Sequence, residues 1–436
     1  MTLTINTERL LRELDELARI TDCPPTQDKS LPEPSQAVTR IVFTPRDLEA
    51  RAWVKELAVA AGFTIREDAV GNMFLRWEGT DPGLGAVGTG SHTDAIPYAG
   101  MYDGTVGVLG GLEAMRSLKE SGFVPKRALE TLVFTSEEPT RFGIGCIGSR
   151  LLGGVIDPEA ADKMHDRLPE TDATASTGLT LADVRQAAGF RGTLASVKLP
   201  IGHYHAWVEV HIEQGPLLER EGVQLGIVTN IAAPASYRYT IEGFGGHAGA
   251  LLMPDRRDAL CAAAEMILSV ERHARAANER SGGIDTVATV GMVGVHPGAV
   301  NSVPSRVTLM LDIRDTDVAR RNGVMEAFHA DIAELEQRRG VKVQEEIINA
   351  DAPAKSSDHI VETVEAICRE EGVSYKKMVS RAYHDSSFVA AVAPVTMLFI
   401  PSRNGVSHRP DEYSTPESIV LGTRVLALAL AKLANE

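Results

Sequence analysis

Apolar residues in the first half of the chain recur at two spacings, one typical of helices and one typical of strands. Leu10, Leu14 and Leu17 form an apolar stripe at helical spacing, which predicts a helix near the start of the chain. Later segments predict strands that alternate with helices, the strands at 86–90, 129–135 and 207–212 and one such helix at 105–121. Strands separated by helices of this length imply a mostly parallel or mixed sheet with helices on both faces, so the expected fold class is α/β.

The pattern changes after about residue 230. Two long helices are predicted among four strands, the helices at 255–278 and 317–338 and the strands at 237–242, 286–295, 307–314 and 341–348. A polar stretch that contains Pro353 follows, and the α/β pattern then resumes. We therefore expect a catalytic domain in two parts, residues 1–229 and 349–436, interrupted by an inserted α+β domain at 230–348.

The composition narrows the class of protein. The chain has 436 residues, more than one hydrophobic core normally serves, which favours two domains. Hydrophobic residues make up 44% and charged residues 24%, as in a folded globular protein. The formal net charge of −15 argues against nucleic acid as a partner, because binding it requires a basic surface. An anionic substrate stays possible, since steering depends on the local potential in a cleft.

The cysteines and the apolar runs indicate a cellular compartment. Four cysteines lie far apart, a pattern typical of thiols in a reducing compartment rather than of disulfides or a zinc ribbon: Cys23, Cys146, Cys261 and Cys368. The N-terminal residues lack the unbroken apolar stretch of a signal peptide. No run approaches the roughly 18 apolar residues that cross a bilayer. We therefore expect a cytoplasmic protein with no membrane partner.

The densest chemical pattern is Gly90-Ser91-His92-Thr93-Asp94, with Asp103 in a glycine-flanked loop soon after it. His92 and Asp94 are two residues apart at the end of a predicted strand, so both side chains point to one face. An imidazole that binds a metal usually needs a partner on its other ring nitrogen, and Asp94 could be that partner. Asp103 could bridge two cations, or it could simply cap the helix that follows.

A second pattern, Ser136-Glu137-Glu138-Pro139, follows a predicted buried strand. Burying two adjacent carboxylates is costly unless they are paired or bind metal. A cation accounts for one of them, and proton transfer accounts for the other. The alternative is a solvated helix start, where acidic residues are favourable.

Two further patterns contain histidines. Strand alternation places Glu209, His211 and Glu213 on one face of a predicted strand. His408 lies in the segment Ser407-His408-Arg409-Pro410-Asp411-Glu412, after the predicted strand 395–400, where a lone histidine is often only a surface residue. Several such patterns at strand ends of one α/β domain are more informative together, because active sites in these sheets gather at the carboxyl ends of strands.

The ordered motifs SHTD, YDG, TSEEPTRFG, HIEQGP, GFGGHAG, NSVP, DIR and SHRPDEYS resemble the M20-type metallopeptidase and amidohydrolase clan. Within it, the chain is similar to the branch of allantoate amidohydrolases, ureidoglycolate amidohydrolases and N-carbamoyl-L-amino-acid hydrolases. The resemblance extends over nearly the whole chain. It implies a metal-dependent catalytic domain with an inserted α+β domain that serves as dimer contact and lid.

The resemblance implies a role for each matching residue. Five of them match the family's metal ligands, with Asp103 as the bridge: His92, Asp103, Glu138, His211 and His408. Glu137 matches the general base and Asp94 the residue that orients His92. Peptide-cleaving relatives have a carboxylate at the position of His211, so a histidine there favours ureide or carbamoyl substrates. The implied cofactor is a pair of divalent ions, with Mn preferred by analogy and Zn equally suited to the ligands.

The resemblance also implies substrate contacts. Gln214, Asn301 and Arg314 match positions that hold the substrate, and His247 matches a histidine that reaches into the partner's site of a homodimer. Closure of the inserted domain would bring Arg314 to the metals and exclude water. An arginine fork suits a substrate carboxylate, although Arg314 could instead pair with the nearby Asp315 or Asp317.

The segment Tyr383-His384-Asp385-Ser386 looks closest to ureidoglycolate amidohydrolases. His384 could contact the substrate or the tetrahedral intermediate, or it could be a core histidine. The implied reaction converts (S)-ureidoglycolate and water to glyoxylate, ammonia and carbon dioxide. The alternatives are hydrolysis of allantoate, N-carbamoyl-β-alanine or N-carbamoyl-L-amino acids with the same metals, and a binding module without activity, which would have no need for Glu137.

Overall fold

The structure is a computed structural model that describes residues 3–24, 28–168 and 177–436. The chain forms two compact units. The larger comprises Met1–Thr229, Lys355–Met378 and His384–Glu436, and the smaller comprises Asn230–Ala354 and Val379–Tyr383. The insertion was expected at 230–348; the smaller unit continues beyond that point and also takes in a short later segment.

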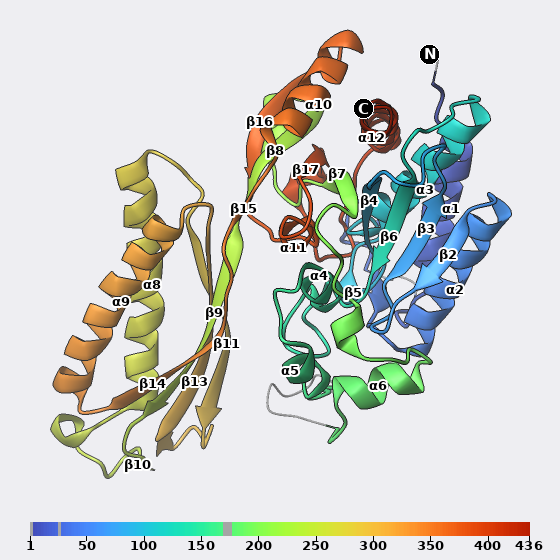
Figure 1. The fold of residues 1–436 in the computed structure, drawn as a ribbon. Helices are drawn as coiled ribbons and strands as arrows, with labels where there is room; N and C mark the ends of the chain where they lie inside the picture. The colour runs from blue at the N-terminus through green and yellow to red at the C-terminus, as the bar shows by residue number, and fades with distance from the viewer. Residues whose placement is uncertain (1–2, 25–27, 169–176) are drawn as a thin grey trace. The chain divides into compact units, whose positions relative to one another are not determined.

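The larger unit is built on a mixed nine-stranded sheet (Figure 1). Its four central strands are parallel and lie in the order β17 (Val395–Ile400), β7 (Tyr204–Ile212), β4 (Ala86–His92) and β6 (Leu129–Phe134). On one side β3 (Met73–Trp77) and β2 (Thr64–Glu67) continue the sheet antiparallel. On the other side lie β8 (Leu225–Ile231), β15 (Ala354–Lys355) and β16 (Tyr375–Ser380).

Two hydrophobic clusters cover the two faces of this sheet. Five helices contribute to the first cluster: α1 (Thr7–Arg19), α2 (Pro45–Ala60), α3 (Thr105–Glu120), α10 (Asp358–Glu370) and α12 (Pro416–Ala434). Four shorter helices contribute to the second: α4 (Ile147–Gly153), α5 (Pro158–Asp162), α6 (Leu181–Ala187) and α11 (Ser386–Val389). Helices on both faces of a sheet with a parallel centre confirm the expected α/β class.

Helix α3 packs unusually close to the sheet. Its residues are buried from Thr105 through Leu118. A Cβ atom on Gly107 would lie 2.6 Å from Cβ of Ser91 on β4, nearer than side-chain carbons approach one another. Glycine at this position therefore lets the helix lie directly behind the strand that ends in His92.

The smaller unit is an antiparallel four-stranded sheet covered by two helices (Figure 1). The strand order is β11 (Val287–His296), β13 (Arg306–Asp315), β9 (Ala233–Glu242) and β14 (Lys342–Ala350). Helices α8 (Ala259–Ser281) and α9 (Val318–Arg339) pack together and close the hydrophobic core of this unit. Each of these elements matches one expected from the apolar pattern.

Other elements were not expected. A two-stranded sheet pairs β1 (Val38–Arg40) with β5 (Ala95–Ala99), and the short helices α4 to α6 lie in a segment whose apolar pattern is irregular. Such short elements depend on packing partners from distant segments, so local periodicity does not reveal them. All four cysteines lie in the described residues and are free thiols. None of the helices formed by the described residues is long and apolar enough to cross a membrane.

Candidate active site

Neighbouring parallel strands of the larger unit bring three of the sequence patterns to one edge of the sheet. His92 ends β4, Glu137 and Glu138 follow the end of β6, and His211 is the last residue but one of β7. Because these strands are parallel neighbours, their carboxyl ends meet at the same edge. His408 joins them from the loop that follows β17.

Asp103 lies at the centre of this group. Its Oδ1 atom is 3.3 Å from Nε2 of His211 and 3.6 Å from Nε2 of His92. Its Oδ2 atom is 3.4 Å from Nε2 of His408, and the same imidazole nitrogen is 3.5 Å from Oε1 of Glu138. The two oxygens of one carboxylate therefore face two different sets of potential ligands.

Both histidines at the strand ends present the same ring nitrogen to this carboxylate. Nδ1 of His92 lies 2.9 Å from the backbone oxygen of Asp94, and Nδ1 of His211 lies 2.9 Å from the backbone oxygen of Ile212. A carbonyl oxygen can only accept a hydrogen bond, so each Nδ1 carries a hydrogen. In the neutral imidazole this leaves the lone pair on Nε2, directed at Asp103, as metal binding requires.

The position of Asp94 differs from the expectation. The Nδ1 atom of His92 is 3.8 Å from the Asp94 carboxylate, so the nearer partner is the Asp94 carbonyl and not its side chain. The carboxylate instead accepts the backbone N–H groups of Glu137 at 3.3 Å and Glu138 at 3.1 Å. Its side chain therefore positions the two glutamates, while its backbone orients the histidine.

Gly104 is required at the start of α3. Its φ of +67° lies in the left-handed region, and a Cβ atom there would meet the ring of His92 at 2.5 Å. The backbone N–H of Gly104 also points at Nε2 of His211, 3.2 Å away. The glycine that was expected to flank Asp103 thus leaves room for the imidazole beside it.

The charges at this edge of the sheet are strongly coupled. Burial alone would lower the pKa of His92, but Glu137, Asp103 and Asp94 outweigh it and raise that pKa well above its usual value of 6.5. Burial raises the pKa of Glu137 to about 8 and that of Glu138 to about 7, with neighbouring carboxylates adding to the effect. Buried negative charge at this density needs positive charge close by.

The donor set fits two divalent cations. His92, His211 and Oδ1 of Asp103 form one group, and within the described residues their ligand atoms approach one another to within 4.8 Å. His408, Glu138 and Oδ2 of Asp103 form the other. Imidazole and carboxylate ligands of this kind suit Zn and Mn alike.

Two further candidates lie against this group. Nε2 of Gln214 donates to Oδ2 of Asp103 at 2.6 Å, so this side chain contacts the central carboxylate directly. His384 is buried, and its ring packs edge-on against that of His211 with 4.5 Å between the centroids. Glu209 lies close to both histidines, with its ligand atom within 4.8 Å of theirs.

The remaining candidates belong to the smaller unit. His247, in β10 (Gly246–His247), is exposed and pairs in register with Ser302 of β12 (Ser302–Val303). The backbone N–H of Ala248 donates to the backbone oxygen of Asn301 at 2.9 Å. The structure therefore places His247 and Asn301 close to each other at one end of this unit. Neither sequence motif by itself indicated that they are neighbours.

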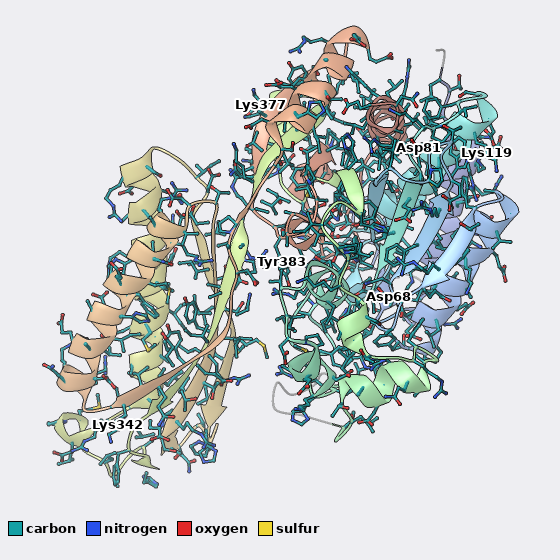
Figure 2. All side chains as sticks on the ribbon, viewed as in Figure 1. Asp68, Asp81, Lys119, Lys342, Lys377 and Tyr383 are labelled. Atoms are coloured by element: carbon teal, nitrogen blue, oxygen red, sulfur yellow. The ribbon has the colours of Figure 1, made fainter. Side chains whose placement is uncertain are left out.

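Arg314 makes a different ion pair from the two that sequence considerations left open. Its Nε donates to Oδ1 of Asp312 at 2.7 Å, whereas Asp315 pairs with Arg320. The Arg314 guanidinium also lies 5.3 Å from the centroid of the Tyr383 ring, a residue labelled in Figure 2. Its side chain is 26% exposed, so part of the guanidinium faces solvent.

Three residues that contact the site were assigned no role from the sequence: Ser407, Glu412 and Cys146. Ser407 donates to Oδ2 of Asp103 at 2.8 Å, and Glu412 accepts the backbone N–H of Asp103 at 3.0 Å. Both lie within the same motif as His408, which could have signalled them. The thiol of Cys146 donates to Oε1 of Glu137 at 3.4 Å, and no feature of its neighbours in the sequence predicts this contact.

Comparison with known proteins identifies the family of the chain. Residues 88–432 match the family model described as peptidase family M20/M25/M40. The chain is 48% identical over 433 residues to a ureidoglycolate hydrolase of Oryza sativa subsp. japonica, covering 98% of this chain and 85% of that one. It is 36% identical to an N-carbamoyl-L-amino acid amidohydrolase of Geobacillus stearothermophilus, with 99% of each chain covered.

Solved structures show a similar fold. A crystal structure of AtUAH in complex with glyoxylate matches with a TM-score of 0.87 and 47% identity, covering 99% of this chain and 98% of that one. AtUAH has also been solved in complex with (S)-hydroxyglycine. The match of fold and sequence over nearly the whole length shows that the chain is a hydrolase that belongs to peptidase family M20/M25/M40.

Proposed function

We propose that this protein is a two-metal amidohydrolase that converts (S)-ureidoglycolate and water to glyoxylate, ammonia and carbon dioxide. The observation that carries the proposal is the placement of Asp103, whose two oxygens face His211 and His92 on one side and His408 on the other. The choice of substrate rests on the plant relatives named ureidoglycolate hydrolase, each 48% identical to this chain.

The proposed metal sites follow from these two groups. His92, His211 and Oδ1 of Asp103 would hold one ion, and His408, Glu138 and Oδ2 of Asp103 the other. When bound, two divalent ions lower the pKa of a water molecule and polarise the scissile carbonyl. The resemblance to ureide hydrolases favours Mn over Zn.

Glu137 is the proposed general base. It lies at the edge of the proposed metal groups, with Oε2 3.7 Å from Nε2 of His92. Its other oxygen accepts the thiol of Cys146, and its backbone N–H is held by Asp94. A carboxylate fixed in this way takes a proton from the attacking water and returns it to the departing nitrogen.

The bond changes balance with a single water. Addition of water to the ureido carbonyl and cleavage of its bond to the terminal nitrogen release one ammonia and leave a carbamic acid. Loss of carbon dioxide from that acid leaves hydroxyglycine, and expulsion of its amino group as a second ammonia leaves glyoxylate. Hydroxyglycine and glyoxylate are the two compounds found in complexes of the solved relative.

Substrate contacts are proposed for residues of each unit taken by itself. In the larger unit, Gln214 lies beside Asp103, and His384 lies beside His211. Arg314, Asn301 and His247 are proposed for the smaller unit on the basis of the family resemblance. We also propose a homodimer, which the resemblance implies through the His247 motif.

Ammonia release tests the proposal. The Mn-loaded protein is assayed against ureidoglycolate, allantoate, N-carbamoyl-β-alanine and N-carbamoyl-L-amino acids at equal concentrations. We expect the largest kcat/KM with (S)-ureidoglycolate. A preference for a carbamoyl amino acid would contradict the substrate and spare the chemistry, whereas no ammonia from any compound would contradict both.

A further inference from the structure

A buried glutamate that the proposed chemistry leaves unused ties together two loops of the site. Glu412 is 2% exposed, and its Oε1 atom accepts the backbone N–H of Tyr102 at 2.8 Å and that of Asp103 at 3.0 Å. These contacts join segments that are separated by about 300 residues along the chain. The backbone of Asp103 is thus held by a side chain from the loop that contains His408.

The other oxygen of Glu412 lies beside the hydroxyl group that also faces the Asp103 side chain. Oγ of Ser407 lies 2.7 Å from Oε2 of Glu412 and 2.8 Å from Oδ2 of Asp103. Ser407 directly precedes His408, which faces the same Oδ2 atom at 3.4 Å. Glu412 therefore restrains the Asp103 backbone directly, and the single hydrogen of the Ser407 hydroxyl is available to either carboxylate.

Glu412 packs where a side chain on residue 100 would otherwise lie. A Cβ atom on Gly100 would lie 2.3 Å from Cβ of Glu412 and 2.4 Å from its Oε1. Glycine at position 100 therefore leaves the space that Glu412 occupies, because a larger residue there would displace the glutamate. This close packing supports a specific contact between Glu412 and the segment before Asp103, and it is independent of the hydrogen bonds.

We propose that Glu412 is a positioning residue, which holds Asp103 so that its two oxygens face the two histidine groups. The inference rests on the proposed function, because it assigns Asp103 as the shared ligand of two ions. Glu412 acts through hydrogen bonds to the Asp103 loop and contacts none of the proposed ligand atoms of the histidines. Residues that orient metal ligands in this way typically change metal affinity by about 10- to 100-fold when they are removed.

The test measures Mn binding by equilibrium dialysis, with the number of ions per chain counted separately from activity. For Glu412→Ala we expect the affinity of at least one of the two ions to fall about 10- to 100-fold. Glu412→Gln should restore most of it, because the amide oxygen still accepts the two backbone N–H groups and the amide nitrogen can donate to Ser407. Wild-type affinity in Glu412→Ala would overturn the inference.

Two further variants keep the test informative if Glu412→Ala does not fold. Gly100→Ala should displace Glu412 by steric contact and weaken Mn binding in the same direction. Ser407→Ala, which leaves the Glu412 contacts with the Asp103 backbone in place, should weaken Mn binding less. Asp317→Ala is the matched control, since Asp317 accepts two backbone N–H groups at the start of α9, at 2.8 and 3.1 Å. Its Mn affinity should equal that of the wild type.

The outcomes also separate this inference from the proposed function. If the wild-type chain binds two ions and releases ammonia while the Glu412 and Gly100 variants bind Mn equally well, the positioning role is wrong and the proposed function stands. If the wild-type chain binds no divalent ion, both are wrong. A loss of affinity in Asp317→Ala as large as in Glu412→Ala would show a general loss of stability and would also overturn the positioning role.

Discussion

The backbone oxygen of Asp94 lies 2.9 Å from Nδ1 of His92, whereas the Asp94 carboxylate is 3.8 Å from the same nitrogen. The side chain of Asp94 instead accepts the backbone N–H groups of Glu137 and Glu138. One residue therefore contacts both the proposed ligand on β4 and the loop after β6. Its backbone carbonyl contacts His92, whereas its side chain holds the loop that follows β6.

This division predicts the effect of Asp94→Ala. The His92 contact should survive, because a backbone carbonyl remains, but the glutamate loop loses its acceptor. We expect kcat to fall about 10- to 100-fold, with a smaller effect on KM, because the displaced groups act on the reacting atoms. Steady-state kinetics measure this split, and an unchanged kcat would show that the loop holds its position without Asp94.

Glu137→Gln should separate catalysis from metal binding. The amide cannot take a proton, so kcat should fall by a factor on the order of 10² to 10⁴. The metal content, measured by elemental analysis, should stay at the wild-type value because Glu137 is not a proposed ligand. Glu138→Gln is the contrasting variant and should lose metal as well as activity. Activity that persists in Glu137→Gln would remove Glu137 from the role of base.

Arg314→Ala tests the proposed contact with the substrate carboxylate. We expect KM for ureidoglycolate to rise, roughly tenfold or more, with little change in kcat, because a contact with the substrate carboxylate contributes equally to binding of the substrate and of the transition state. Arg272→Ala, on helix α8 of the same unit, serves as control because Arg272 also pairs with a carboxylate, that of Asp331. An unchanged KM would show that the pairing of Arg314 with Asp312 is purely structural.

Removal of metal should lower the thermal stability of the protein. Without cations, the buried carboxylates around Asp103 repel one another, and ligands that bind only the folded state stabilise it by mass action. At a free ion concentration of about 1,000 times Kd the gain is about 4 kcal/mol. Thermal unfolding after treatment with chelator should show a lower Tm that Mn restores. A Tm that does not respond to chelator or to Mn would contradict a pair of resident ions.

The lowered pKa of Glu130 predicts that the stability of the fold depends on pH for a reason unrelated to the active site. Burial alone would raise its pKa, but hydrogen bonds from His203, Tyr204 and Arg76 lower that pKa to about 2. A lowered pKa contributes stability that is present above the usual value of 4.5 and is lost as pH falls toward about 2. The full contribution is on the order of 3 kcal/mol.

Glu130→Gln should therefore lower the Tm by a few degrees at pH 7, and the gap from wild type should shrink at pH 3. Glu78→Gln is the matched control, because Glu78 also pairs with Arg76 but is 58% exposed. Its effect should be small at both values of pH, as for most surface ion pairs. An equal gap at pH 7 and pH 3 would show that the ionised form of Glu130 does not stabilise the fold.

Much of this architecture could be read from local patterns. The alternation along β7 places Val210 and Ile212 in the core with α3 and leaves Glu209 and His211 on the other face, as expected. The strand at Val395–Ile400 has the predicted bounds. Periodicity reports which face a side chain occupies, and the parallel order of the strands then brings their carboxyl ends together.

The contacts between atoms depended on tertiary packing. The amino-acid order indicated that Asp94 lies near His92 but not that its carbonyl, rather than its carboxylate, makes the contact. It placed Glu412 in the same motif as His408 but did not specify that this side chain accepts the backbone N–H of Asp103, 309 residues away. Local spacing restricts the direction of a side chain, whereas its partners depend on which distant segments the folded core brings within hydrogen-bond distance.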